Sequence, residues 1–189
     1  MSLKKPHTRI IGGSYKGTKI SFTASTDLRP TENRTRETLF NWLMFNIEDS
    51  ICLDMFAGTG ALGIEALSRG AKHVTFIEKN QKFCRIIEKA LVDINAEERS
   101  EVINSNSLRY LERKEGEAFD IIFVDPPFRK GLIEKSCNLF KTKNLLKKDG
   151  LIYIEQENEF NLIDMVPKLQ EIKASKAGQT KFGLYRYED

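Results

Sequence analysis

From residue 50 onward, short apolar runs alternate with stretches in which apolar residues recur every three or four positions. The first pattern is typical of buried strands and the second of amphipathic helices. Strands are predicted at 51–56, 74–77, 101–104, 119–124 and 151–155, and helices at 61–69, 81–95, 108–114 and 132–142. Alternating strands and helices form a parallel sheet with helices on both faces. We therefore predict an α/β fold for this part of the chain.

The two ends of the chain have other patterns. Near the start, 9–11 and 18–22 are predicted strands around a glycine-rich turn, which indicates a hairpin. Near the end, 171–175 and 182–187 flank a second turn and predict an antiparallel pair. The segment between the hairpin and residue 50 begins with Thr31, a good helix N-cap, and then has a helical stripe. The apolar residues of this stripe are Leu39, Phe40, Leu43, Met44 and Ile47.

Trp42 lies off the centre of that stripe. We expect it to pack beneath the hairpin, although a contact with a partner is also compatible with its position.

Length and composition favour one compact domain, since the 189 residues are 40% hydrophobic. Because no apolar run approaches the roughly 18 residues of a membrane span, we expect a cytoplasmic protein with no membrane partner. We also expect the protein to be a monomer. The cysteines Cys52, Cys84 and Cys137 and the histidines His7 and His73 stand far apart. Structural zinc sites use closely spaced ligands, so we expect no metal site.

Charge is distributed unevenly along the chain. Residues 1–36 hold eight basic and two acidic residues, a net charge of +6. Because the whole chain has a net charge of +3, residues 37–189 have a net charge of −3. A basic leading segment on a slightly acidic body indicates an arm that binds a polyanion, although a solvated surface gives the same count.

A glycine-rich turn follows the strand at 51–56. Gly58, Gly60 and Gly63 have the spacing of the dinucleotide fingerprint, and Glu78 follows 20 residues after the first of them. In such folds the glycines let a ligand approach the backbone, and the acid binds ribose hydroxyls. The pattern fits a nicotinamide cofactor and S-adenosylmethionine equally well.

Asp54 favours the second cofactor. An acid before the glycine turn repels a pyrophosphate but attracts a ligand with a positively charged amino group. After the strand predicted at 101–104, Asn106 offers an amide that can contact adenine. A helix N-cap by Ser105 or Asn106 explains this segment equally well. The predicted cofactor-binding residues are Asp54, Phe56, Ala57, Gly58, Gly60, Glu78, Asn106 and Ser107.

The segment Asp125-Pro126-Pro127-Phe128 follows the apolar run 121–124 and so stands at the end of a buried strand. Proline has no N–H group, so carbonyl groups and the Asp125 carboxylate dominate this rigid platform. It matches an amino group with two hydrogens, such as the exocyclic amine of a nucleobase, and Phe128 can cover the face of the base. Asp125, Pro126, Pro127 and Phe128 are therefore the predicted catalytic residues, with a structural turn as the alternative.

At this point the chain resembles the bacterial RsmD-like methyltransferases, which modify the N2 amine of a guanine in small-subunit ribosomal RNA. The resemblance runs over nearly the whole length. Its motifs are 9–13, 28–31, Arg34, 36–43, 53–54, 56–58, 60–63, 65–69, 104–106 and 123–129.

The resemblance implies a class I, Rossmann-like methyltransferase fold, with a seven-stranded sheet whose last strand is antiparallel. A basic hairpin extension is expected at 1–28 and the S-adenosylmethionine-dependent domain at 29–189. The implied reaction is methyl transfer to a guanine N2 amine of 16S rRNA, within a 30S subunit or an assembly intermediate.

The RNA contacts expected from charge are Arg9, Lys16, Lys19, Arg29, Arg34 and Arg36. Arg34 or Arg36 can instead hold the carboxylate of the cofactor or pair with Glu37. Rival interpretations are an N6-adenine DNA methyltransferase, a nicotinamide oxidoreductase and a catalytically inactive ribosome-assembly factor.

Overall fold

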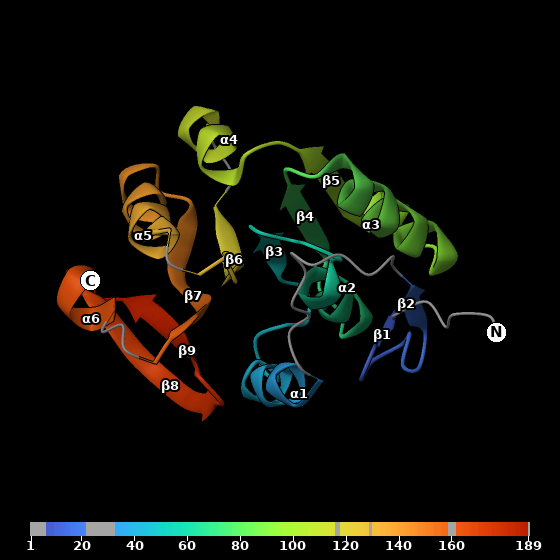
Figure 1. The fold of residues 1–189 in the computed structure, drawn as a ribbon, viewed down its shortest axis with the longest axis horizontal. Coiled ribbons are helices and arrows are strands. Elements are labelled where there is room, and N and C mark those ends of the chain that lie inside the picture. Colours follow the sequence, from blue (N-terminus) through green and yellow to red (C-terminus); the bar gives the residue numbers. More distant parts are fainter. Residues whose placement is uncertain (1–6, 22–32, 116–117, 129, 159–161, 189) are drawn as a thin grey trace.

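The computed structural model describes residues 7–21, 33–115, 118–128, 130–158 and 162–188. A seven-stranded sheet forms its centre and a two-stranded hairpin lies at one end (Figure 1). The strands are β1 (His7–Arg9), β2 (Lys19–Ser21), β3 (Ile51–Asp54), β4 (His73–Glu78), β5 (Ser100–Asn104), β6 (Phe119–Val124), β7 (Leu146–Glu157), β8 (Leu169–Ala177) and β9 (Thr180–Tyr187). The α-helices are α1 (Asn33–Trp42), α2 (Ala61–Ser68), α3 (Gln81–Asp93), α4 (Ser107–Arg113), α5 (Leu132–Thr142) and α6 (Leu162–Met165), and a 3₁₀ turn spans Glu97–Arg99.

The order of the central sheet is β5-β4-β3-β6-β7-β9-β8. Strands β3 to β7 are parallel, and β9 runs antiparallel to both of its neighbours. The chain first builds the sheet outward from β3 to β5 and then returns to place β6 on the other side of β3. Ligands of open α/β sheets bind at such a reversal, beyond the carboxyl ends of the strands.

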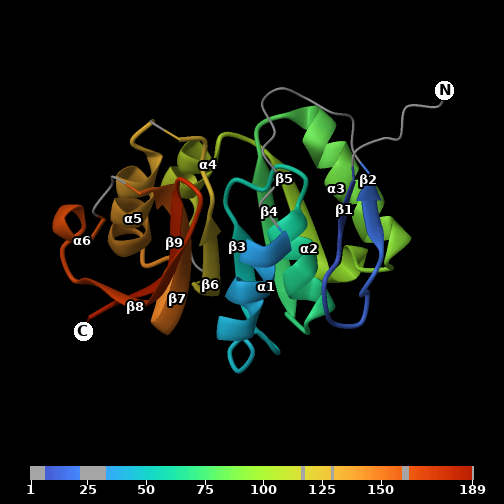
Figure 2. The same cartoon turned by 60° about the horizontal axis from the view of Figure 1, so that its bottom comes forward.

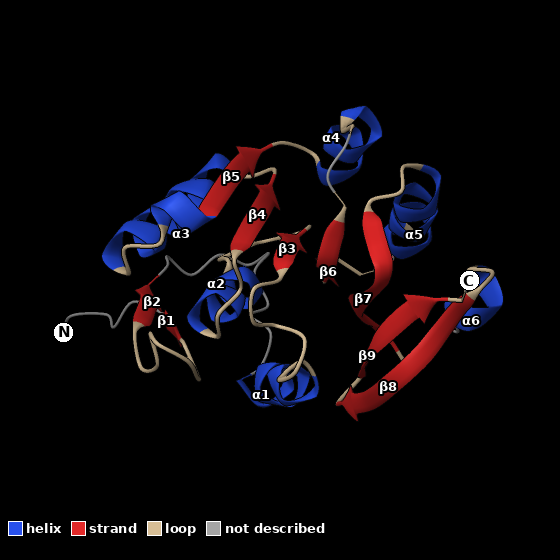
Figure 3. Ribbon diagram, turned by 180° about the vertical axis from the view of Figure 1, so that it is seen from behind, coloured by secondary structure: helices blue, strands red, loops and turns tan. Residues whose placement is uncertain are grey.

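Helices cover both faces of the sheet (Figures 2 and 3). One face packs against α1, α2, α3 and the hairpin, whose Ile10 and Ile20 belong to the same core cluster as Phe40 and Ile64. The other face packs against α4, α5 and α6, with Phe140 and Leu162 in its cluster. The strands β3, β4 and β6 are thus buried on both sides, which explains why they appear in the sequence as largely apolar runs, whereas β5 at the edge of the sheet is partly exposed.

The predicted α/β alternation, the seven-stranded sheet with an antiparallel last strand and the N-terminal hairpin are confirmed. The first hairpin strand has the predicted length but begins two residues earlier, so that Ile10 and Ile11 lie beyond β1, and β2 is shorter than predicted. The helix α6 had no periodic signal because it has only four residues. Thr31, Arg29 and the boundary expected between 28 and 29 lie outside the described residues.

Two expectations for α1 are wrong. Met44 is 59% exposed, although Leu43 and Ile47 of the same stripe are buried; all three lie beyond Trp42, where α1 ends and the helical period no longer decides which side chain faces the core. The Trp42 ring does not lie beneath the hairpin but stacks on Phe182 of β9, with ring centroids 5.6 Å apart. Trp42 therefore joins α1 to the C-terminal strand.

The hairpin is fastened to α2 by a buried carboxylate. Glu65 accepts hydrogen bonds from the backbone N–H groups of Ile11 at 2.7 Å and Gly12 at 2.8 Å. Its Oε1 also accepts from Arg69 Nε at 2.8 Å, and the Arg69 guanidinium lies 5.1 Å from the centre of the Phe40 ring. The Glu65 side chain has no exposed surface, so its charge is stabilised by these donors rather than by water.

Arg36 makes the second attachment of the hairpin. Its Nη2 donates to Thr8 Oγ1 at 2.9 Å, to the Arg9 carbonyl at 2.7 Å and to Asn33 Oδ1 at 2.7 Å. Burial lowers the pKa of Arg36, and the nearby Glu65 charge acts in the opposite direction. The assignment of Arg36 to RNA contacts is wrong, because its guanidinium is fully buried and faces the hairpin.

In the part of the chain that the structure describes, no helix has both the length and the apolar character needed to cross a membrane.

We expect Glu65→Ala to destabilise the protein by about 3–5 kcal/mol, because the Arg69 charge and two backbone N–H groups lose their acceptor in a buried setting. Urea unfolding at equilibrium measures the change. Glu88→Ala, on the exposed side of α3, is the matched control and should shift the free energy of unfolding by no more than about 0.5 kcal/mol. A loss for Glu65→Ala as small as that of the control would contradict the role of Glu65.

Candidate active site

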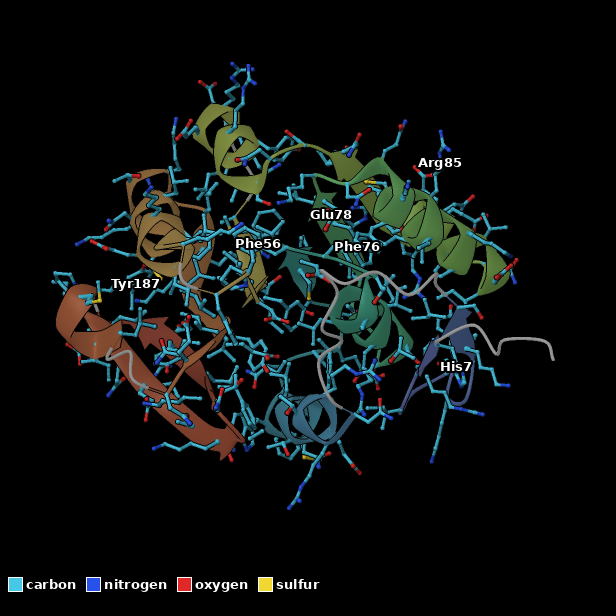
Figure 4. The ribbon with its side chains drawn as sticks, viewed as in Figure 1. His7, Phe56, Phe76, Glu78, Arg85 and Tyr187 are labelled. Atoms are coloured by element: carbon cyan, nitrogen blue, oxygen red, sulfur yellow. The ribbon has the colours of Figure 1, made fainter. Side chains whose placement is uncertain are left out.

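A cavity of about 810 Å³ lies at the carboxyl ends of β3, β4, β6 and β7. Its volume is in the range of small-molecule sites, about 300–1,000 Å³. Figure 4 labels Phe56, two residues beyond β3, and Glu78, the last residue of β4, and both lie in the middle of the molecule. The cavity is lined by Thr35, Asp54, Phe56, Ala57, Gly58, Thr59, Ala61, Leu62, Ile77, Glu78, Lys79, Asn80, Phe83, Asn106, Ser107, Leu108, Asp125, Pro126, Pro127, Phe128, Lys130, Leu132, Glu155, Ala177 and Thr180.

The glycine turn between β3 and α2 shapes one wall. Gly60 has φ 77°, in the left-handed region that other residues avoid, and serves as the N-cap of α2. A Cβ on Gly63 would lie 2.2 Å from the Phe76 ring, so only glycine lets α2 pack this close to β4. Gly60 does not contribute to the lining, although its neighbours Gly58 and Thr59 do.

Asp54 ends β3 with only 3% of its surface exposed. Its Oδ2 accepts a hydrogen bond from the Gly63 N–H at 3.0 Å. Burial raises the pKa of Asp54 to about 7, the charges of Asp125 and Glu78 add to the rise, and the Gly63 hydrogen bond opposes it. Near neutral pH this carboxyl group is therefore poised to ionise when a cation binds beside it.

Glu78 ends β4, and two backbone N–H groups fix its carboxylate. Gly58 donates to Oε2 at 2.9 Å and Asn80 donates to Oε1 at 2.7 Å. Each carboxylate oxygen has a further lone pair, so Glu78 can still accept hydroxyl donors from a ligand in the cavity. This arrangement suits the pair of hydroxyls on a ribose ring.

Asn106 and Ser107 enter from the start of α4. The Asn106 side chain accepts from the Arg109 N–H at 3.1 Å, so the helix-cap interpretation is confirmed, while a contact with adenine remains a prediction. Ser107 is buried and its Oγ donates to the Met55 carbonyl. This hydrogen bond ties α4 to the end of β3 and holds the Asn106 side of the cavity in place.

The segment Asp125–Phe128 follows β6, the strand beside β3, and lines the same cavity as the glycine turn. Asp125 is half-buried directly after β6, and its charge acts on both Asp54 and Tyr153. Pro126 is buried and Phe128 half-buried. A second cavity of about 430 Å³ shares Pro126, Pro127 and Phe128 with the first, so this segment stands between two hollows.

Several lining residues were not predicted as site residues, and Phe83, Glu155 and Thr180 are among them. Phe83 lies in the helix predicted at 81–95, where its apolar side chain fits the core-facing stripe, yet it is half-buried and lines the cavity. Glu155 and Thr180 come from β7 and β9, which have no motif that marks them. The only signal for Glu155 was its charge at the end of an apolar strand.

The basic residues of the hairpin region differ in their surroundings. Arg9, Lys16, Lys19 and Arg34 are exposed, as contacts with a polyanion require. Arg29 lies outside the described residues. Across the described ranges, no group of three or more His, Cys, Asp or Glu side chains is arranged to hold a metal ion.

The order of the strands is that of the class I S-adenosylmethionine-dependent methyltransferase fold, and Asp54 and Glu78 stand at the ends of its strands β3 and β4. A solved structure described as a putative methyltransferase yhhF from Escherichia coli has a TM-score of 0.86 and 41% identity, covering 97% of this chain and 99% of that one. A putative methylase HI0767 from Haemophilus influenzae has a TM-score of 0.82 and 38% identity, covering 97% and 100%.

The chain belongs to the family described as "Conserved hypothetical protein 95", whose sequence model matches residues 8–186. A relative from Escherichia coli strain K12, named "Ribosomal RNA small subunit methyltransferase D", is 44% identical, and the match covers 98% of this chain and 96% of the relative. The protein of the same name from Buchnera aphidicola subsp. Acyrthosiphon pisum is 46% identical over 84% of this chain and 82% of its own.

The raised pKa of Asp54 makes ligand binding dependent on pH. A group with a pKa of about 7 is mostly protonated at pH 6 and mostly ionised at pH 8, and the ionised form attracts a cationic amino group. We therefore expect the affinity for S-adenosylmethionine to rise about tenfold from pH 6 to pH 8, as calorimetry would measure. Asp54→Asn keeps an acceptor for the Gly63 N–H but loses the charge, so its weaker affinity should not change with pH. An equally steep rise in this variant would contradict the assignment to Asp54.

Proposed function

We propose that this protein transfers a methyl group from S-adenosylmethionine to the exocyclic N2 amine of a guanine in small-subunit (16S) ribosomal RNA. One observation carries the proposal: the Asp125–Phe128 platform and the acids Asp54 and Glu78 line a single cavity. The names of the relatives from Escherichia coli and Buchnera support the choice of substrate.

The side chains of the cavity fit S-adenosylmethionine in their chemistry. Asp54 lies where it attracts the cationic amino group of the methionine moiety, and Glu78 has free acceptor positions for the ribose hydroxyls. Phe83 and Asn106 line the same cavity and offer a ring face and an amide for adenine. When bound, the cofactor supplies an electrophilic methyl group on a sulfonium.

The catalytic work of the chain is to position the amine. The Asp125 carboxylate and the Pro126 carbonyl each accept one amine hydrogen, which turns the nitrogen lone pair toward the cofactor side of the cavity. Positioning of this kind can supply roughly 7–11 kcal/mol in favourable cases. Once methylated, the nitrogen is cationic and acidic, so it loses its proton without a strong base.

The target base must leave its stack to reach this platform. Unstacking costs a few kcal/mol, which an aromatic side chain partly offsets by covering the exposed face of the base. We assign this role to Phe128, and its half-buried ring and its position in the lining of both cavities support the assignment. The second cavity gives room for a neighbouring part of the RNA chain.

The basic extension at 1–28 and Arg34 act as the RNA-binding arm on the methyltransferase domain. The fastening of the hairpin by Glu65 and Arg36 keeps Arg9, Lys16 and Lys19 at a fixed position relative to α2. We further propose that the substrate RNA is presented within a 30S subunit or an assembly intermediate, and that the protein acts as a monomer.

Asp125→Ala tests the catalytic platform. We expect methyl transfer to small-subunit rRNA to fall about 100- to 1,000-fold, because one amine hydrogen loses its acceptor, while S-adenosylmethionine still binds. Transfer of radiolabelled methyl groups measures turnover, and calorimetry measures cofactor affinity. Asp93→Ala, on the exposed end of α3, serves as the control. Turnover of Asp125→Ala close to that of the control would refute the role of Asp125.

Replacing Lys16 and Lys19 together by alanine tests the arm. Loss of two phosphate contacts should weaken RNA binding and reduce the slope of log affinity against log salt by about 1.4 to 1.8. Filter binding at several salt concentrations gives the slope. The double variant of Lys141 and Lys143, two exposed residues at the end of α5, is matched in charge and should leave the slope unchanged. Equal slopes for the two double variants would remove the hairpin from the RNA interface.

A further inference from the structure

Beside Asp125, a second carboxylate lines the cavity. Glu155 lies near the end of β7 and is only 7% exposed. Val124 of β6 pairs in register with Ile154 of β7, so Asp125 and Glu155 follow at neighbouring positions of two parallel strands. Two buried or half-buried acids thus stand side by side where the proposed substrate amine enters.

A rigid group holds the Glu155 side chain. The Tyr153 hydroxyl donates to Glu155 Oε1 at 2.7 Å, and the Tyr153 ring packs between Phe123 and Phe182 with centroids 6.4 Å from each. The tyrosine takes up one acceptor position of Glu155, and a carboxylate has about four. Glu155 therefore lines the cavity in an orientation that Tyr153 helps to fix, and a carboxylate accepts more than one hydrogen bond at a time.

A second acceptor beside the amine site can distinguish between the bases. In guanine, one of the two ring nitrogens next to the exocyclic amine, N1, carries a hydrogen. In adenine and cytosine, the ring nitrogen next to the amine carries a lone pair instead. A carboxylate beside the amine site accepts the guanine N1–H and repels the other two bases, whose lone pairs would face a negative charge.

We propose that Glu155 selects guanine by accepting its ring N1–H, while Asp125 and Pro126 hold the neighbouring amine. Tyr153 is then a positioning residue that fixes the Glu155 carboxylate. The inference rests on the proposed function and extends it, because it explains why this platform takes guanine rather than adenine. A site built to accept a hydrogen bond discriminates strongly against an analogue that lacks the donor.

The test combines a change in the base with a change in the protein. 2-Aminopurine keeps the 2-amino group of guanine but lacks the N1 hydrogen. Small-subunit particles are reconstituted with guanine or 2-aminopurine at the modified position, and kcat/KM is measured for both with each enzyme. Because 2-aminopurine also lacks the O6 atom, the comparison between enzymes, in which this effect cancels, carries the conclusion.

The wild-type enzyme should prefer guanine by about 100-fold or more, and Glu155→Gln should reduce that preference at least about tenfold. The carboxamide binds the N1–H less strongly, and it can donate to the lone pair of 2-aminopurine. Tyr153→Phe should reduce the preference in the same direction but less. Glu88→Gln, the same substitution on the exposed side of α3, should leave both rates unchanged.

The outcomes separate the two proposals. If the wild-type enzyme methylates neither base, the proposed function itself fails. If it methylates guanine, but Glu155→Gln lowers both rates equally, Glu155 does not select the base. A wild-type preference for guanine below about threefold would overturn the inference without any variant, even if Glu155→Gln does not fold.

Discussion

The parallel arrangement of β3, β4, β6 and β7 forces four carboxyl groups to one edge of the sheet. Asp54, Glu78, Asp125 and Glu155 all line the same cavity there. Burial and the neighbouring charges raise the pKa of Asp54 to about 7, and the hydrogen bond from Gly63 offsets only part of this rise. Negative charges in this cavity repel one another, and a cationic ligand reduces that repulsion. This constraint favours a sulfonium cofactor over a nicotinamide dinucleotide, whose pyrophosphate would add negative charge.

One short helix connects the cofactor turn to the proposed RNA arm. The N-terminus of α2 follows the glycine turn, where the Gly63 N–H holds Asp54. Two residues later on the same helix, Glu65 fastens the hairpin through Ile11 and Gly12. The close packing of α2 on β4 at Gly63 leaves little room for the helix to shift. A polyanion bound to the hairpin would thus have a fixed position relative to the cavity.

Local patterns predicted most of the fold and the two walls of the site. The glycine turn, Asp54, Glu78 and the segment 125–128 are each marked by residues that stand next to a strand end, so spacing along the chain was enough to find them. Contacts between distant segments could not be found in this way. Trp42 meets Phe182 from the far end of the chain, and Arg36 has the same charge in the sequence whether it is buried or exposed. Phe83 stands at the edge of a helical stripe, where periodicity cannot separate core from cavity. Glu155 comes close to Asp125 only through the pairing of β6 with β7, which the local sequence pattern does not reveal.

The identity of the methylated nucleoside tests the account most directly. Unmethylated small-subunit particles are incubated with the protein and isotopically labelled S-adenosylmethionine, and the RNA is digested to nucleosides for mass spectrometry. The carboxylate pair beside the double proline requires the label in N2-methylguanosine. Label in N6-methyladenosine, or no label in the RNA, would contradict the account.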